Sequence, residues 1–189
     1  MTSTLSTQVP GYVAGTWTID PSHSEVGFAV RHLMVSKVRG KFTSFEGHIV
    51  TGEDPLASSV TASVDLASID TGTEQRDEHI RSADFFEVEA NRTMTYRSTG
   101  IRPDGDDFVL EGELTLKGVT RPVPLALELN GFGDDPWGGT RVGFSARGEI
   151  NRSDFGISWN AALEGGGVVV GDKVQIHLEI EAVLDQPTD

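Results

Sequence analysis

The sequence predicts an all-β protein, an eight-stranded antiparallel β-barrel with one short helix. Apolar and polar residues alternate along most of the chain, as in strands that have one wet and one dry face. Turn-forming residues separate the alternating stretches, and a single segment departs from the alternation. Amphipathic strands in this number can bury their apolar faces by closing on themselves, which also removes the exposed sheet edges that promote aggregation.

Eight stretches carry the alternation and are predicted as strands. In chain order they are residues 26–32, 37–50, 60–66, 93–99, 108–116, 123–129, 142–150 and 174–182. The fifth and sixth flank Lys117-Gly118, so we expect them to form a hairpin. In the second, the apolar residues change from even to odd positions near Thr43-Ser44, and a β-bulge there would keep them on one face.

The segment that departs from the alternation, residues 71–82, is polar and is predicted to contain the helix. Thr71 is followed three residues later by Glu74, a spacing that fits a capping box. We therefore expect a short helix at about residues 72–82, lying over one end of the barrel. The apolar pair Phe85-Phe86 follows it.

Composition limits the classes of partner. The chain has 189 residues, of which 37% are hydrophobic, enough for one domain with a sizeable core. Its 15 Lys and Arg against 29 Asp and Glu give a net charge of −14, so repulsion from nucleic acid and anionic membranes is expected. The sequence has no cysteine, which excludes disulfides and thiolate metal ligands.

The chain is expected to consist of a flexible tail, residues 1–12, and a barrel domain, residues 13–186. The first ten residues lack the basic start and apolar core of a secretion signal. No stretch approaches the roughly 20 apolar residues of a membrane-spanning helix, so we expect a cytoplasmic protein without stable membrane insertion.

The alternation does not decide whether the barrel is filled or hollow. An eight-stranded barrel can be filled by side chains or can hold one small ligand. Small residues such as Gly40, Gly112 and Ala146 lie in phase with large ones such as Phe28 and Phe144. The small residues could leave room for a ligand, or they could complement large residues across a filled interior.

Among the five histidines, His32 is the one that shares the parity of an apolar row. It is either a core histidine with hydrogen-bond partners or a group that meets a ligand. His23 lies in the Asp20-Pro21-Ser22-His23 turn and is expected to hydrogen-bond there, whereas His177 has outward parity and is expected to be solvated. The histidines show no metal-ligand spacing, so no metal site is predicted.

Catalysis has weaker support in the sequence. Ser153 and Asp154 could be drawn with a histidine as a triad, but the chain has no Gly-x-Ser-x-Gly elbow. The enzyme alternative is an enzyme acting on an apolar prenyl or ester substrate, with His32 as general base and residues 152–154 in support.

Eight motifs follow one another along the chain. They are Trp17-Thr-Ile-Asp-Pro-Ser-His-Ser24, Val26-Gly-Phe-Ala-Val-Arg-His32, Val38-Arg-Gly-Lys-Phe42, Arg76-Asp-Glu-His-Ile-Arg-Ser82, Asp84-Phe-Phe86, Gly112-Glu-Leu-Thr-Leu-Lys-Gly118, Ile150-Asn-Arg-Ser-Asp-Phe-Gly156 and Val170-Gly-Asp-Lys-Val174. In this order they resemble the YceI-like, polyisoprenoid-binding family, and the resemblance covers nearly the whole chain. It implies a lipocalin-like barrel whose elongated apolar cavity holds a polyisoprenoid or isoprenoid quinone, with a carrier or storage role.

The resemblance further implies no catalysis, no required cofactor and a homodimer. The candidate ligand-binding residues are Phe28, Val30, His32, Phe42, Val64, Phe85, Phe86, Met94, Leu114, Leu116, Phe144 and Trp159. Arg31 and Arg39 are further candidates for the head-group end, beside His32. The third alternative is a stress or scaffold protein with a filled barrel and a working acidic surface.

Overall fold

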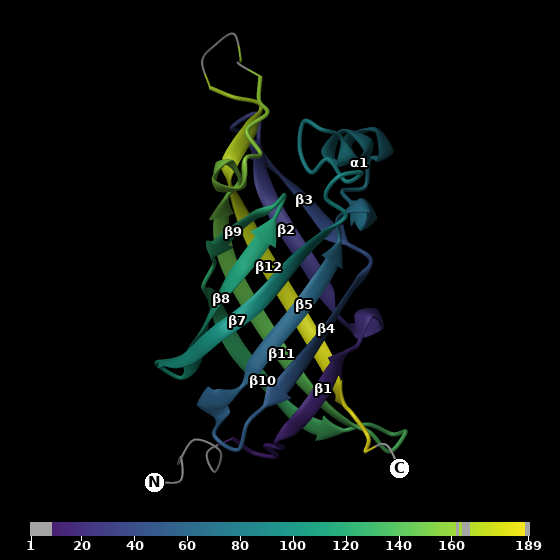
Figure 1. Ribbon diagram of the computed structural model, residues 1–189, viewed down its shortest axis with the longest axis vertical. Helices are drawn as coiled ribbons and strands as arrows, with labels where there is room; N and C mark the ends of the chain where they lie inside the picture. The colour runs from purple at the N-terminus through teal and green to yellow at the C-terminus, as the bar shows by residue number, and fades with distance from the viewer. Residues whose placement is uncertain (1–8, 162, 164–166, 188–189) are drawn as a thin grey trace.

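Strands tilted around a common axis make up most of the computed structural model, which describes residues 9–161, 163 and 167–187 (Figure 1). The strands are β1 (Gly15–Ile19), β2 (Glu25–His32), β3 (Ser36–Phe42), β4 (Phe45–Thr51), β5 (Ser59–Asp65), β6 (Ile69–Asp70), β7 (Thr93–Asp104), β8 (Asp107–Leu116), β9 (Val119–Pro122), β10 (Leu125–Asp134), β11 (Thr140–Asn151) and β12 (Val170–Leu184). One α-helix, α1 (Glu74–Arg81), and four short 3₁₀ helices occur in this part of the chain.

The strands form a closed antiparallel barrel with eight positions, as the sequence predicts. β1 and β2 lie end to end along the same edge of β12, with Trp17 opposite Leu184 and Val26 opposite Leu178. Three other positions of the barrel are also occupied by two strands that lie end to end, namely β3 with β4, β5 with β6, and β9 with β10. The pairing of β1 with β12 closes the barrel. The predicted fold class and the hairpin around Lys117-Gly118 are confirmed.

Short local features divide two of these positions into two strands each. The 3₁₀ helix Pro21–His23 separates β1 from β2, because the Asp20 carboxylate accepts a hydrogen bond from the Ser22 N–H and turns the chain. Residues 43–44 separate β3 from β4 at the predicted change of parity. Phe42 before the break and Ile49 after it are both buried, so the break keeps the apolar side chains inside.

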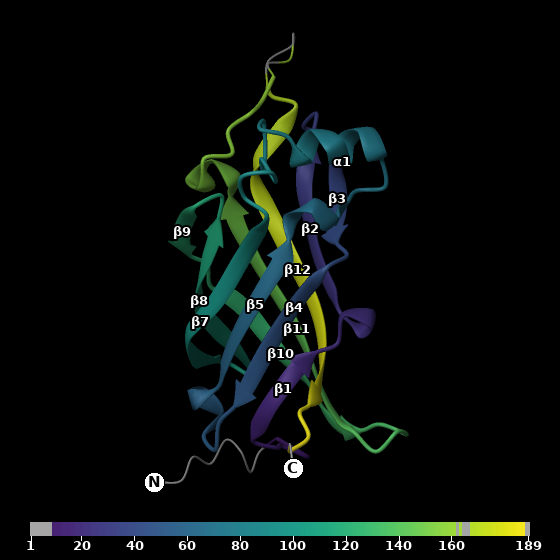
Figure 2. The same cartoon turned by 45° about the vertical axis from the view of Figure 1, so that its right-hand side comes forward.

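The helix is confirmed, but the predicted capping box is wrong. Helix α1 lies at one end of the barrel, beside the β2–β3 turn (Figure 2). Its N-cap is Thr73, which makes no side-chain capping bond. Gly72 adopts φ +85°, which turns the chain just before the helix. The Thr71 N–H then donates to Oδ1 of Asp77, in the first turn of α1, at 2.9 Å. Thr71 therefore binds Asp77 instead of capping the helix.

The two ends of the barrel differ. We call the end with α1, the β2–β3 turn (residues 33–35) and residues 156–161 and 167–169 the helix end, and the opposite end, with the β10–β11 loop, the far end (Figure 1). At the far end Trp17 is fully buried and its Nε1–H donates to Thr51 Oγ1 at 2.8 Å.

Part of the predicted tail also packs at the far end. Residues 1–8 lie outside the described residues, but Tyr12 donates to the Gly52 carbonyl at 2.7 Å and packs edge to face on Phe132. The predicted boundary at residue 12 thus falls inside a turn that packs against the barrel.

Candidate functional site

The barrel is hollow. Its interior holds a cavity of about 710 Å³, lined by residues from every strand position and from α1. This volume lies within the range of roughly 300–1,000 Å³ that is typical of small-molecule sites. The wall consists almost entirely of aliphatic and aromatic side chains, as expected for a site that removes an apolar ligand from water.

All twelve candidate binding residues named from the sequence lie in the wall of this cavity. They are Phe28, Val30, His32, Phe42, Val64, Phe85, Phe86, Met94, Leu114, Leu116, Phe144 and Trp159. Their contact with a ligand stays a prediction. For the candidates that lie on strands, the placement follows from strand parity, because successive side chains of a strand point to opposite faces of the sheet.

The cavity exists although small residues do complement large ones. A Cβ atom on Gly112 would clash with the phenol ring of Tyr96, and one on Gly40 would lie 2.5 Å from Phe28 Cζ. Tyr96 also donates its hydroxyl to the Val123 carbonyl at 2.9 Å, and burial raises its pKa to about 12. Pairing of small with large side chains therefore shapes the wall without filling the interior.

Arg152 is the most deeply buried charged group of the wall. Its side chain is 6% exposed, and burial lowers its pKa from the usual range. The guanidinium donates to four carbonyl groups, those of Ile157, Trp159, Val170 and Gly171, at 2.9–3.3 Å. These bonds tie the end of β11 to the start of β12 and fix residues 157–159 at the helix end.

Aromatic rings surround this end of the cavity. His79 from α1 packs edge to face on both Phe85 and Trp159, with ring centroids 5.1 and 4.7 Å apart. The Arg152 Cζ atom lies 5.9 Å from the centre of the Phe85 ring, within the distance of a cation–π contact.

The helix also supplies wall residues that were not predicted from the sequence. Gln75, Arg76, His79 and Ile80 all line the cavity, and the first three are polar. Their spacing places them on one side of a helix, and this periodicity is the signal that could have identified them. The polar composition of the segment favoured a solvated cover over the barrel end, so its inward side was not predicted.

His32 lies in the cavity wall at the helix end and is half-buried. It pairs in the sheet with Val170, whose carbonyl accepts a hydrogen bond from Arg152. Arg31 also borders the cavity, at its rim, whereas Arg39 is exposed on the outer face of β3 and is absent from the described lining. The candidacy of Arg39 is corrected, because its neighbours Val38 and Gly40 have the inward parity.

Ser153, the candidate nucleophile of the triad, binds an aspartate and no histidine in the described part of the chain. The Ser153 hydroxyl donates to Asp172 Oδ2 at 2.8 Å, and the Ser153 N–H donates to Asp172 Oδ1. Within the described residues, no histidine hydrogen-bonds Ser153. Asp172 thus holds the start of β12 against the turn after β11, which is a structural role.

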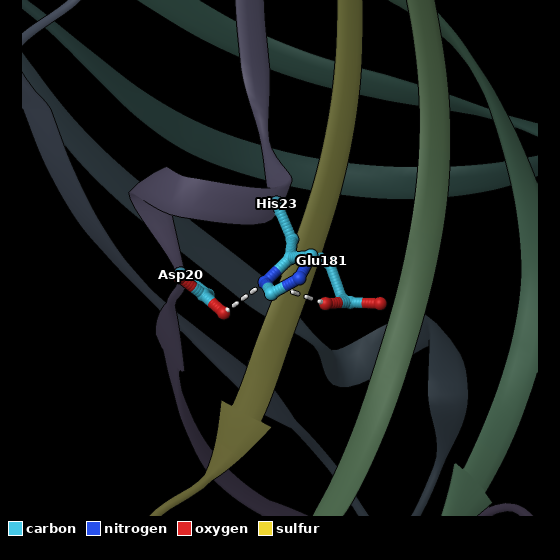
Figure 3. Close-up of side chains that lie close together, drawn as sticks. All are labelled: Asp20, His23 and Glu181. Atoms are coloured by element: carbon cyan, nitrogen blue, oxygen red, sulfur yellow. Dashed lines mark hydrogen bonds and ion pairs between the residues drawn. The ribbon is translucent and has the colours of Figure 1, made fainter. Parts of the chain in front are cut away.

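A second polar cluster lies outside the cavity, where Asp20, His23 and Glu181 converge (Figure 3). His23 Nδ1 lies 2.8 Å from Asp20 Oδ2, which confirms the predicted turn role. Arg141 Nη1 donates to both carboxylates, at 2.9 Å to Asp20 and 2.8 Å to Glu181. The guanidinium supplies the positive charge that a metal ion would bring, so the cluster is an ion-pair network.

A closed antiparallel barrel with an apolar interior and polar groups at one end defines a lipocalin-like binding barrel. No helix of the described chain is long and apolar enough to span a membrane. The YceI-like domain model matches residues 17–182, so the chain belongs to the YceI-like family.

Relatives and solved structures agree with this assignment. Protein YceI of Escherichia coli O157:H7 is 43% identical over 148 residues, 77% of this chain and 78% of the relative. A Campylobacter jejuni YceI structure is 28% identical, has a TM-score of 0.69, and covers 88% of this chain and 96% of its own. A polyisoprenoid binding domain from Saccharophagus degradans, implicated in plant cell wall breakdown, shares the fold at 16% identity and TM-score 0.68 over 92% of this chain and 100% of its own.

Proposed function

We propose that this protein binds a polyisoprenoid or isoprenoid-quinone-like lipid in its cavity and acts as a carrier or store for that lipid. The observation that carries the proposal is the apolar cavity of about 710 Å³ that runs inside the barrel. The polyisoprenoid-binding relative from Saccharophagus degradans supports the class of ligand. Binding requires no cofactor and no bond-making step, so we infer a carrier and not an enzyme.

The energetics fit an isoprenoid chain. A five-carbon unit gains about 3 to 4 kcal/mol on leaving water, at about 0.8 kcal/mol per buried methylene-sized group. Ordering the chain and losing its translational freedom offset part of this gain. A few buried units therefore suffice for tight binding, and polar contacts are needed only at the head group.

The test is identification of the lipid that co-purifies with the protein. Native mass spectrometry of the purified protein should show a bound mass, and organic extraction followed by mass spectrometry should identify a prenyl compound. Farnesol and geranylgeraniol should displace an environment-sensitive dye from the cavity. Absence of any lipid, together with a dye that no prenyl compound displaces, would overturn the proposal.

Two further expectations accompany this function. The protein is proposed to be a homodimer, which sedimentation velocity measures directly. It is also proposed to work in the cytoplasm, and fractionation of cells producing the full chain tests that location.

A further inference from the structure

The charges of the cavity wall are opposite in sign to those of the whole chain. The chain carries 29 acidic residues, yet Glu46 is the one carboxylate among the described lining residues. Arginine and histidine are represented by Arg31, Arg76 and Arg152 and by His32 and His79. An acidic protein thus presents a basic lining to whatever enters the cavity.

The arginines of the wall differ from the other arginines in their partners. The described ion pairs of arginine involve Arg81, Arg92, Arg97, Arg102 and Arg141. None of these five lines the cavity. Among the described residues, no carboxylate lies within 4 Å of the guanidinium nitrogens of Arg31, Arg76 or Arg152. Arg152 is buried, Arg76 is half-buried and Arg31 is exposed at the rim, and the carboxylate whose charge acts on Arg152 is Asp172, outside the described lining. Buried charges in proteins are normally paired, and no carboxylate of the described lining pairs with these three arginines.

Arg152 and Arg76 both retain donors after their internal bonds are counted. A guanidinium has five N–H groups. The four hydrogen bonds of Arg152 leave one Nη2 hydrogen uncommitted. Arg76 uses Nε and Nη2 to bind Thr71, and no described bond uses its Nη1 group.

These donors converge on the helix end. Trp159 accepts a bond from Arg152 and packs on His79, which follows Arg76 by three residues in α1. The N-terminal turn of α1 adds its own donors there, since Thr73 and Gln75 line the cavity and Thr73 makes no side-chain cap. Of the carboxylates near Arg76 in sequence, Asp77 accepts from Thr71 and Glu74 pairs with Arg81, and neither these two nor Glu78 belongs to the described lining.

We propose that the helix end of the cavity is a subsite for an oxyanion head group, a phosphate or a carboxylate, on an apolar chain. The subsite rests on the proposed function, since it orients a chain that the rest of the cavity buries. Arg152 and Arg76 supply charge-assisted hydrogen bonds to the oxyanion, and Arg31 adds positive charge at the rim. The head group of the ligand then neutralises the charge that the wall leaves unpaired.

The experiment compares ligands that share a chain and differ in the head group. Calorimetric titration measures the Kd of farnesyl phosphate against farnesol, and of palmitate against hexadecanol. We expect the phosphate to bind at least about tenfold more tightly than the alcohol, a preference that decreases at high salt. A preference in both pairs indicates a general oxyanion subsite, and a preference in the first pair alone indicates a phosphate subsite.

Variants separate this subsite from lipid binding as such. Arg76→Gln and Arg31→Gln should each reduce the preference several-fold, because the Kd of farnesyl phosphate rises more than that of farnesol, whereas Arg39→Gln, on the outer face of β3, should leave both values unchanged. Arg152→Gln removes four bonds that hold the chain together, so Arg76→Gln is the decisive variant. Equal binding of farnesyl phosphate and farnesol, or a full preference in Arg76→Gln, overturns the subsite alone. Failure of every ligand to bind overturns the proposed function.

Discussion

Two histidines in one short stretch show how environment assigns different roles to the same side chain. His23 lies in a 3₁₀ turn outside the barrel and binds the Asp20 carboxylate. His32, nine residues later, ends the inward row of β2 and lines the cavity. Strand parity separated the two roles in advance. The partners of Asp20 were not predictable, because Arg141 and Glu181 are far from it in the chain and meet it only through β11 and β12.

The Asp20 carboxylate should make the stability of the fold depend on pH. Hydrogen bonds from Ser22, His23 and Arg141 lower the pKa of this carboxyl. A lowered pKa stabilises the fold above the carboxyl's unfolded value of about 3.9, and this contribution is lost as the pH falls through the folded value. We expect Asp20→Asn to reduce the free energy of unfolding by about 1 to 3 kcal/mol at pH 7, and by less at pH 3.

Urea unfolding of both proteins at pH 7 and pH 3 measures this difference. Asp106→Asn, in the exposed β7–β8 turn, is the matched control and should change stability little at either pH. A loss of the same size at both pH values would contradict an electrostatic role for Asp20.

At the scale of the elements, the sequence predicted the number of barrel strands but not their interruptions or the role of the helix. Period-two alternation is a local property, so it identified the strands and the change of parity at residues 43–44. The capping box failed because Asp77, which lies outside that four-residue motif, competes for Thr71. The inward side of α1 was missed because Ile80 is its one apolar residue among the described lining and the others are polar, and amphipathic patterns reveal inward faces only when these are mostly apolar.

Close packing between neighbouring strands predicts different effects for two strand glycines. Gly112 on β8 faces the ring of Tyr96, where a Cβ atom has no room, whereas a Cβ atom on Gly100 of β7 would meet nothing within 4 Å. Gly112→Ala should therefore destabilise the protein by about 1 to 3 kcal/mol through overpacking. Gly100→Ala should be neutral or slightly stabilising, because alanine loses less backbone entropy than glycine on folding.

Thermal and urea unfolding of the two single variants measure the effect. The dye-binding capacity of the cavity reports whether the ring of Tyr96 has moved inward. Equal stability of the two variants would show that the contact between Tyr96 and the Gly112 backbone is not tight in solution.

At the scale of the whole molecule, the hollow interior could not be predicted from the sequence. Parity identified which side chains face inward, but the space between facing walls depends on how the eight positions are tilted and staggered around the barrel. The net charge of −14 was also an incomplete guide, because the basic groups of the wall are gathered from β2, α1 and the β11–β12 connection only by folding. The net charge predicts repulsion between the protein and other polyanions, whereas the charge of the cavity wall depends on which residues the fold brings together.

Filling the cavity should separate lipid capacity from stability. Ala146 lines the middle of the barrel, opposite Leu127 and Leu178 in the sheet, and the inward residues of β12 from Val174 to Ile180 span roughly 20 Å at about 3.3 Å per residue. Ala146→Phe adds a ring to this part of the cavity wall. We expect its affinity for geranylgeraniol to fall at least about tenfold, the equivalent of about 1.4 kcal/mol, with a smaller loss for farnesol.

Arg147→Phe, which changes the neighbouring exposed residue, is the control and should bind both prenols as the parent does. Dye displacement measures the affinities and thermal unfolding the stability. An Ala146→Phe protein that is folded and binds geranylgeraniol unchanged would place the lipid outside the barrel.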